Sequence, residues 1–233
     1  MCFWEPYGLL FTMAITPITI TGKFDIVSGL WLAPMVPRAC LVLAHGAGAG
    51  MTHSSMAAIA NGLDFLGIAT LRYEFPYMER GSKRVDPPVV AHATVRAAVA
   101  EAGRRAGSLP LFAGGRSFGG GMTSQAQATE PLEDVRGLVF FAFPLHPARR
   151  PSTKRADHLQ GITVPMLYLQ GDKDSLAEVT LLRETVNCVP GLATLYLVDD
   201  ADHAFHVPAR TGRKDAMVPA DTLTAAVAWM DAL

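Results

Sequence analysis

Short apolar runs separated by helical patterns follow one another along most of this chain, and that arrangement leaves few folds open. The runs are apolar throughout rather than at alternate positions, as in Cys40-Leu41-Val42-Leu43-Ala44 and Leu138-Val139-Phe140-Phe141-Ala142-Phe143. Such runs are typical of strands buried on both faces, which occur in parallel sheets covered by helices. We therefore expect an α/β fold with a mostly parallel sheet and helices on both faces.

The same patterns place the expected elements along the chain. Strands are expected near residues 18–20, 29–33, 40–44, 68–73, 109–113, 138–143, 166–170 and 194–198. Helices are expected over 54–66, from 86 to about 107, after 119, and over 221–233. Asp86 is predicted to cap the second helix, with Pro87 as its first residue. In such sheets function gathers in the loops beyond the carboxyl ends of the strands.

No repeat, low-complexity block or linker divides the chain. We expect a single domain over residues 18–233 and an N-terminal tail of uncertain order at 1–17. The apolar stretch 9–20 is interrupted by Pro17 and is too short to span a bilayer. No Lys or Arg precedes Lys23, which argues against a secretory signal.

Composition excludes several classes of protein. The formal net charge of the 233 residues is −1, which indicates neither a nucleic-acid partner nor a polybasic membrane anchor. The three cysteines (Cys2, Cys40 and Cys188) are too few and too widely spaced for a disulfide framework, so a cytoplasmic location is expected. The histidines do not cluster at metal-ligand spacing, and we expect no metal and no other cofactor.

The segment Gly115-Arg116-Ser117-Phe118-Gly119 is a G-x-S-x-G pentapeptide. An apolar run precedes it and a helical pattern follows it, and in that context the serine sits on a sharp strand-to-helix turn with its hydroxyl exposed. The following helix would direct its N-terminal N–H groups toward an oxyanion at this serine. Ser117 is therefore the candidate nucleophile. A chance match in a chain with 21 glycines is the competing explanation.

A serine nucleophile needs a base, and the base needs a carboxylate that fixes its tautomer. Both follow in the expected order, each after a predicted strand. Gly171-Asp172-Lys173-Asp174 supplies two candidate acids, of which we favour Asp174 because Asp172 lies within the turn itself; Asp172 stays open as the alternative. His203 is favoured over His206 as the base because it is nearer the end of its strand.

A tetrahedral intermediate requires two backbone N–H donors for its oxyanion. Phe118, the residue after the nucleophile, is expected to supply one. The loop His45-Gly46-Ala47-Gly48 is expected to supply the other, through Ala47 or, as the near alternative, Gly48. The loop lacks the spacing of a phosphate-binding motif.

Four segments together resemble the α/β-hydrolase superfamily: residues 43–48, 115–120, 171–174 and 201–205. Within it, Arg72-Tyr73-Glu74-Phe75-Pro76-Tyr77-Met78-Glu79 is similar to a small bacterial subfamily related to dienelactone hydrolases and to vertebrate testis-expressed protein 30. The resemblance runs from about Ile18 to the C-terminus and implies the same triad and oxyanion donors. It departs from dienelactone hydrolase, whose nucleophile is a cysteine. Only residues 144–165 separate two of the predicted strands, which implies that no large lid is present.

These features predict a serine hydrolase, specifically a carboxylesterase that acts on a small soluble ester, as a monomer or homodimer. Five loop residues at the same sheet edge are predicted to bind the substrate: Phe75, Tyr77, Leu145, His146 and Phe205. A basic patch (Arg149, Arg150, Lys154 and Arg155) is either a solvated face or a contact for an anionic substrate. Two alternatives stay open: a non-catalytic scaffold with this fold, and a thioesterase, amidase or peptidase.

Overall fold

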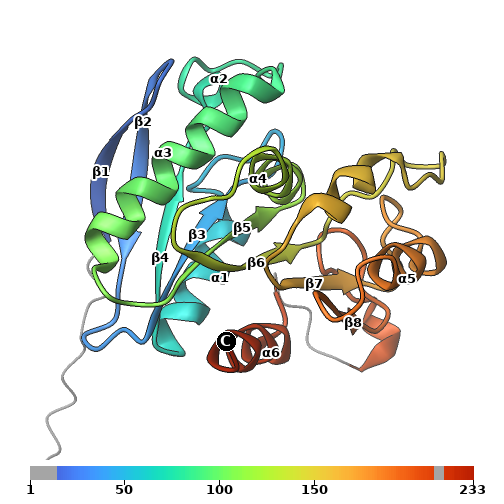
Figure 1. Cartoon of the computed structure of the whole chain (residues 1–233). Coiled ribbons are helices and arrows are strands. Elements are labelled where there is room, and N and C mark those ends of the chain that lie inside the picture. Colours follow the sequence, from blue (N-terminus) through green and yellow to red (C-terminus); the bar gives the residue numbers. More distant parts are fainter. Residues whose placement is uncertain (1–14, 213–217) are drawn as a thin grey trace, which may run out of the picture.

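The computed structural model describes residues 15–212 and 218–233, and a single sheet of eight strands runs through it (Figure 1). The strand order is β1-β2-β4-β3-β5-β6-β7-β8. The strands are β1 (Thr16–Thr21), β2 (Ile26–Leu32), β3 (Ala39–Ala44), β4 (Ile68–Tyr73), β5 (Leu111–Arg116), β6 (Val135–Phe141), β7 (Met166–Gly171) and β8 (Ala193–Val198). Strand β2 runs antiparallel to β1 and β4, and the other pairs are parallel, which confirms the predicted sheet.

Helices follow most of the strands. They are α1 (Ser54–Phe65), α2 (Pro76–Glu79), α3 (Pro88–Ala106), α4 (Phe118–Thr129), α5 (Val179–Asn187) and α6 (Ala220–Asp231), with 3-10 helices η1 (Lys154–Gly161) and η2 (Ala209–Thr211). The sequence patterns did not predict α2 or α5. Most of the predicted tail, residues 1–14, lies outside the described residues, and β1 begins two residues before the predicted domain start at Ile18.

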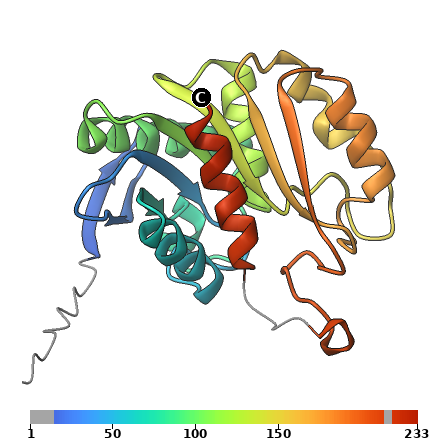
Figure 2. The same ribbon diagram turned by 90° about the horizontal axis from the view of Figure 1, so that it is seen from below.

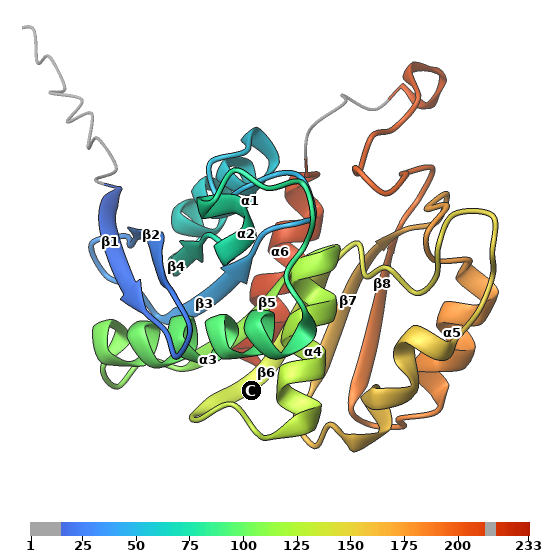
Figure 3. The same ribbon diagram turned by 90° about the horizontal axis from the view of Figure 1, so that it is seen from above.

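The sheet is buried on both faces, which explains the continuous apolar runs. Leu41 and Leu43 of β3 pack into one core with α1 and α6 (Figure 2), whereas Cys40 and Val42 pack into the other with α3, α4, η1 and α5 (Figure 3). Side chains of a strand alternate between its two faces, so one strand contributes to both cores. The predicted helices on both faces are confirmed.

The predicted start of α3 is wrong by a short segment. The helix begins at Pro88, with Pro87 as the capping residue, and Asp86 makes no capping hydrogen bond to it. The Asp86 carboxylate instead accepts hydrogen bonds from the backbone N–H of Tyr77 (2.8 Å) and the guanidinium of Arg80 (2.6 Å). A buried carboxylate takes the strongest donors within reach, and here they come from α2.

The connection between β6 and β7 is short. Residues 142–165 hold η1 as their regular element, and no further layer covers the carboxyl ends of the strands there. Within residues 15–212 and 218–233, no helix has the length and apolar character needed to cross a bilayer. Because the connection between β6 and β7 is short, no large lid covers the carboxyl edge of the sheet within the described residues, and the predicted site residues lie at that edge.

Candidate active site

Ser117 occupies the sharp turn between β5 and α4. Its φ is +49°, a left-handed conformation that non-glycine residues rarely adopt and that commonly marks functional sites. The flanking glycines are required by crowding: a Cβ at Gly115 would lie 2.6 Å, and one at Gly119 2.5 Å, from the carbonyl oxygen of Ala44. The G-x-S-x-G pattern therefore lets β3, β5 and α4 approach closely enough to present Ser117 at the sheet edge.

A continuous hydrogen-bond chain joins the three predicted triad residues. The Oγ of Ser117 lies 2.9 Å from Nε2 of His203, and Nδ1 of His203 lies 2.7 Å from Oδ2 of Asp174. A carboxylate can only accept, so Nδ1 carries the proton and Nε2 is the free base that faces the hydroxyl. The Asp174 side chain is fully buried and that of His203 is 23% exposed, so the base is partly accessible to solvent.

Asp174 rather than Asp172 lies against the histidine. Besides His203, the Asp174 carboxylate accepts hydrogen bonds from the side-chain amide of Gln170 and the backbone N–H of Leu176 (2.7 Å), which fix its orientation. Asp172 instead forms an ion pair with Lys173 at 2.9 Å. Since Gly171 ends β7 and the turn follows, the second acid of the motif is the one that reaches His203 in the loop after β8.

The loop after β8 is shaped by its own side chains. Oδ1 of Asp202 accepts from the backbone N–H groups of Ala204 (2.8 Å) and His206 (3.0 Å), which closes a turn next to His203. Arg116, which precedes the nucleophile, donates a hydrogen bond to the carbonyl of His203 at 3.3 Å. Burial lowers the pKa of Arg116, while Asp174 and Asp202 act in the opposite direction. Arg116 is thus a positioning residue that the sequence patterns did not single out.

The two predicted oxyanion donors belong to segments that flank the same cavity as Ser117. Ala47 and Phe118 both line this cavity together with the serine. Within the described residues, the backbone N–H groups of Ala47 and Phe118 donate to no acceptor. Phe118 is the first residue of α4, where helix geometry leaves the N–H group without an intrahelical partner. Both N–H groups are therefore available to donate a hydrogen bond to an oxyanion.

The loop that carries Ala47 is tied to the end of β4. The ring of His45 accepts from the backbone N–H of Phe75 through Nε2 (3.0 Å) and bonds the carbonyl of Gly46 through Nδ1 (2.8 Å). Further along, Met51 is held from both sides: Glu74 accepts from its N–H (2.9 Å) and Arg72 donates to its carbonyl (3.0 Å). Fixing both ends of the loop preorganises the backbone between them.

A cavity of about 420 Å³ opens beside Ser117, a size suited to a small organic molecule. Most of its wall is apolar. Besides Ser117, the lining residues with polar side chains are Gln125 and Arg155. The lining residues are Ala47, Val85, Ser117, Phe118, Gly121, Met122, Gln125, Phe143, Pro144, Arg155 and Leu176. Of these residues, only Ala47, Ser117 and Phe118 were predicted as site residues from the sequence. Arg155 belongs to the basic patch that the sequence also showed.

The structure does not bring the five predicted substrate-binding residues into the wall of this cavity. Phe75 and Tyr77 are buried behind it and contact the ring of Phe118 edge to face, at centroid distances of 5.3 and 6.1 Å. Leu145 is buried in the core under η1 and Phe205 in the core under α6. His146 accepts from the N–H of Glu178 (2.9 Å) in a separate recess. Large apolar loop side chains have turned into the core, where they gain the most from burial.

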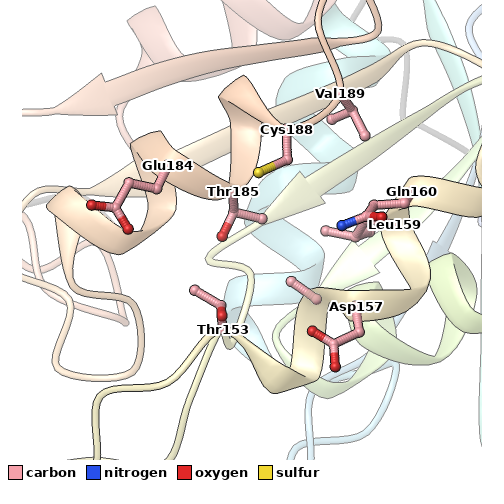
Figure 4. A pocket seen from close by; sticks show the side chains of 9 residues that line it. Thr153, Asp157, Leu159, Gln160, Glu184, Thr185, Cys188 and Val189 are labelled. Carbon is pink, nitrogen blue, oxygen red and sulfur yellow. The ribbon is translucent and has the colours of Figure 1, made fainter.

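A second cavity, of about 180 Å³, lies between η1 and α5 (Figure 4). It is lined by Asp157, Glu184, Cys188 and six other residues, and none of the predicted site residues is among them. No group of three or more His, Cys, Asp or Glu side chains that could hold a metal ion occurs in the part of the chain that the structure describes. The predicted nucleophile and both predicted oxyanion donors thus lie at the cavity beside Ser117 and not at this second cavity.

Comparison with known proteins agrees with this geometry. The sequence matches one family, described as "Alpha/beta hydrolase domain", over residues 37–231. Similar solved structures include an alpha-beta serine hydrolase homologue from Coxiella burnetii (20% identity, TM-score 0.68, covering 83% of this chain and 91% of that one). Others are a dienelactone hydrolase from Anabaena variabilis (18%, 0.71, 92% and 93%) and a serine hydrolase without a lid from Xanthomonas campestris (22%, 0.67, 84% and 88%). At these identities the likeness shows a shared fold.

Proposed function

The chain belongs to the alpha/beta hydrolase domain family, and on that premise we propose that it is a serine hydrolase that cleaves a carboxylic ester through an acyl-enzyme. The observation that carries the proposal is the hydrogen-bond chain from Ser117 through His203 to Asp174. A carboxylate, an imidazole and a hydroxyl in this sequence can activate the hydroxyl near neutral pH.

In the proposed reaction, Oγ of Ser117 attacks the ester carbonyl and its proton passes to Nε2 of His203. Asp174 stabilises the imidazolium that results. The carbonyl oxygen gains negative charge and accepts from the N–H groups of Ala47 and Phe118. When the bond to the leaving oxygen breaks, His203 returns the proton to the departing alcohol. Water then attacks the acyl-enzyme by the same steps and releases the acid and free Ser117.

Two observations support an ester as the substrate. The cavity wall is mainly apolar, which suits a small acyl group. The connection between β6 and β7 is short, which suits a substrate that reaches the site from solution. One of the similar structures is a dienelactone hydrolase, and a lactone is a cyclic ester. Thioesters and amides share the triad chemistry, so the bond type is decided by a panel with one acyl group as ester, thioester and amide.

The first test is hydrolysis of short and medium 4-nitrophenyl esters by the wild type and by Ser117→Ala. Loss of the nucleophile is expected to lower turnover by about 10³-fold or more. A fluorophosphonate probe, which reacts only with an activated serine, is applied to both proteins. Equal turnover in the two proteins would refute the proposal. Absence of labelling and of turnover in the wild type would instead favour a non-catalytic scaffold.

A further inference from the structure

One helix supplies a continuous strip of the wall of the cavity beside Ser117. Phe118, Gly121, Met122 and Gln125 of α4 all line it. They follow the spacing i, i+3, i+4, i+7 and therefore lie on one face of the helix. From Phe118 to Gln125 the helix rises about 10 Å, at about 1.5 Å per residue. The cavity thus extends from the nucleophile along two turns of α4.

The two ends of this strip differ in chemistry. Ser117 and the predicted oxyanion donors lie at the N-terminal end of α4. Met122 lies between these ends on α4, and most of the remaining lining is apolar, with Val85, Phe143, Pro144 and Leu176. Gln125 lies at the far end, and Arg155 is the one charged residue of the lining among the described residues. A ligand that fills the cavity therefore meets an apolar middle and hydrogen-bond donors away from the nucleophile.

Gln125 is held so that its amide nitrogen remains free. Its Oε1 lies 3.3 Å from Nε2 of His92 on the neighbouring helix α3. An amide oxygen can only accept, so the histidine donates. Burial lowers the pKa of His92, which keeps the ring neutral near pH 7, with its proton on Nε2. Within the described residues the side-chain NH₂ of Gln125 makes no hydrogen bond, so its two N–H groups are left for a ligand.

Arg155 is positioned by the packing of η1, and its side chain is exposed. It lies in the first turn of η1, whose Ala156 and Leu159 pack into the core. The ring of His158, also on η1, lies 2.8 Å from the hydroxyl of Ser124 and so joins η1 to α4. Within residues 15–212 and 218–233, the guanidinium of Arg155 makes no ion pair and no hydrogen bond. A cation whose backbone is fixed beside a cavity without a carboxylate is poised to bind an anion.

The rest of the basic patch does not share this position. Arg149 lines the separate recess that holds His146, and neither Arg150 nor Lys154 lines the cavity beside Ser117. A purely solvated patch would not place one of its members in the wall of the cavity. Arg155 is therefore distinguished from its neighbours by geometry rather than by charge.

We propose that the natural substrate is an ester with a free carboxylate at the far end of its acyl group, bound by Arg155 and Gln125 while the scissile carbonyl lies at Ser117. The proposal rests on the proposed function and adds its substrate class. The apolar methylene chain of such a half-ester would pass Met122 and Phe143. A bidentate guanidinium–carboxylate pair would set the position of the carbonyl along α4.

The test compares two substrates that differ only in charge: mono-4-nitrophenyl suberate and its methyl ester. The ratio of their kcat/KM values is measured for the wild type, Arg155→Gln and Lys154→Gln. Both variants remove one positive charge from an exposed position of the same patch. We expect Arg155→Gln to lower the acid-to-methyl-ester ratio by about 10-fold or more, as for loss of one charge-assisted hydrogen bond. Lys154→Gln is expected to leave the ratio as it is in the wild type.

An unchanged ratio in Arg155→Gln, or an equal fall in both variants, would overturn the proposal, because either result means that no specific contact is made. Binding is measured independently of turnover, by calorimetric titration of monomethyl suberate and dimethyl suberate into Ser117→Ala with and without Arg155→Gln. If the wild type hydrolyses no ester while Ser117→Ala binds the acid selectively and through Arg155, the proposed function is refuted and the anion site is kept. Binding that does not depend on Arg155 would refute the site.

Discussion

A methyl group added at Gly119 should separate β3 from α4 and damage the candidate site. In Gly119→Ala the new Cβ would lie 2.5 Å from the carbonyl oxygen of Ala44, 2.6 Å from its carbon and 2.6 Å from the carbonyl oxygen of His45. Heavy atoms in contact are about 3.5–4.0 Å apart, so a displacement of about 1 Å is required. All three neighbours are backbone atoms, so no side-chain rotation can relieve the overlap.

The magnitude follows from two opposing effects. Overpacking of this kind costs about 3 kcal/mol, the upper end of the usual range. Alanine is about 1 kcal/mol more favourable than glycine within a helix, so the net loss of unfolding free energy is about 2 kcal/mol. For a domain of this size that corresponds to a fall in Tm of about 4–8 °C. The loop that carries Ala47, one of the two proposed oxyanion donors, follows Ala44 directly, so ester turnover should fall as well.

Gly121→Ala is the matched control in the same helix. No atom lies within 4 Å of a Cβ at Gly121, so only the gain in helix propensity remains, about 0.5–1 kcal/mol. Its Tm should therefore rise by about 1–4 °C. Thermal unfolding followed by circular dichroism measures both variants against the wild type. If Gly119→Ala melts at or above the wild-type temperature, the close approach of β3 and α4 is not what requires a glycine there.

Two further predictions concern single side chains. Asp174→Asn should lower kcat by about 10⁴-fold because the amide neither fixes the imidazole tautomer nor stabilises the imidazolium, whereas Asp172→Asn should retain wild-type kcat; steady-state kinetics with a 4-nitrophenyl ester would contradict this if the two variants behaved alike. Burial lowers the pKa of His158 in the folded protein below its usual value of 6.5. As the pH falls below 6.5, the unfolded chain therefore binds a proton more readily than the folded protein, and the free energy of unfolding decreases. Urea unfolding at several pH values should show a smaller loss in His158→Gln, and an equal loss would refute the assignment.

The strands could be predicted because their burial is recorded in the sequence. A strand covered on both faces must be apolar at every position, so β3 and β6 are visible as continuous runs. Helices α2 and α5 were not predicted, because a helix of four residues and a helix with two buried side chains leave little apolar pattern. Helix α3 was predicted with the wrong capping residue, since the partners of Asp86 lie on a different element.

The sequence alone determined that Ser117, Asp174 and His203 lie at one edge of the sheet. Each follows a predicted strand, and parallel strands bring their carboxyl ends to the same edge whatever the details of packing. Only the tertiary structure decided that Asp174 rather than Asp172 meets the imidazole, and that Phe75 and Phe205 turn into the cores while Gln125 and Arg155 line the cavity. The physical reason is that the direction of a loop side chain depends on which neighbours can cover it, and those neighbours are distant in sequence.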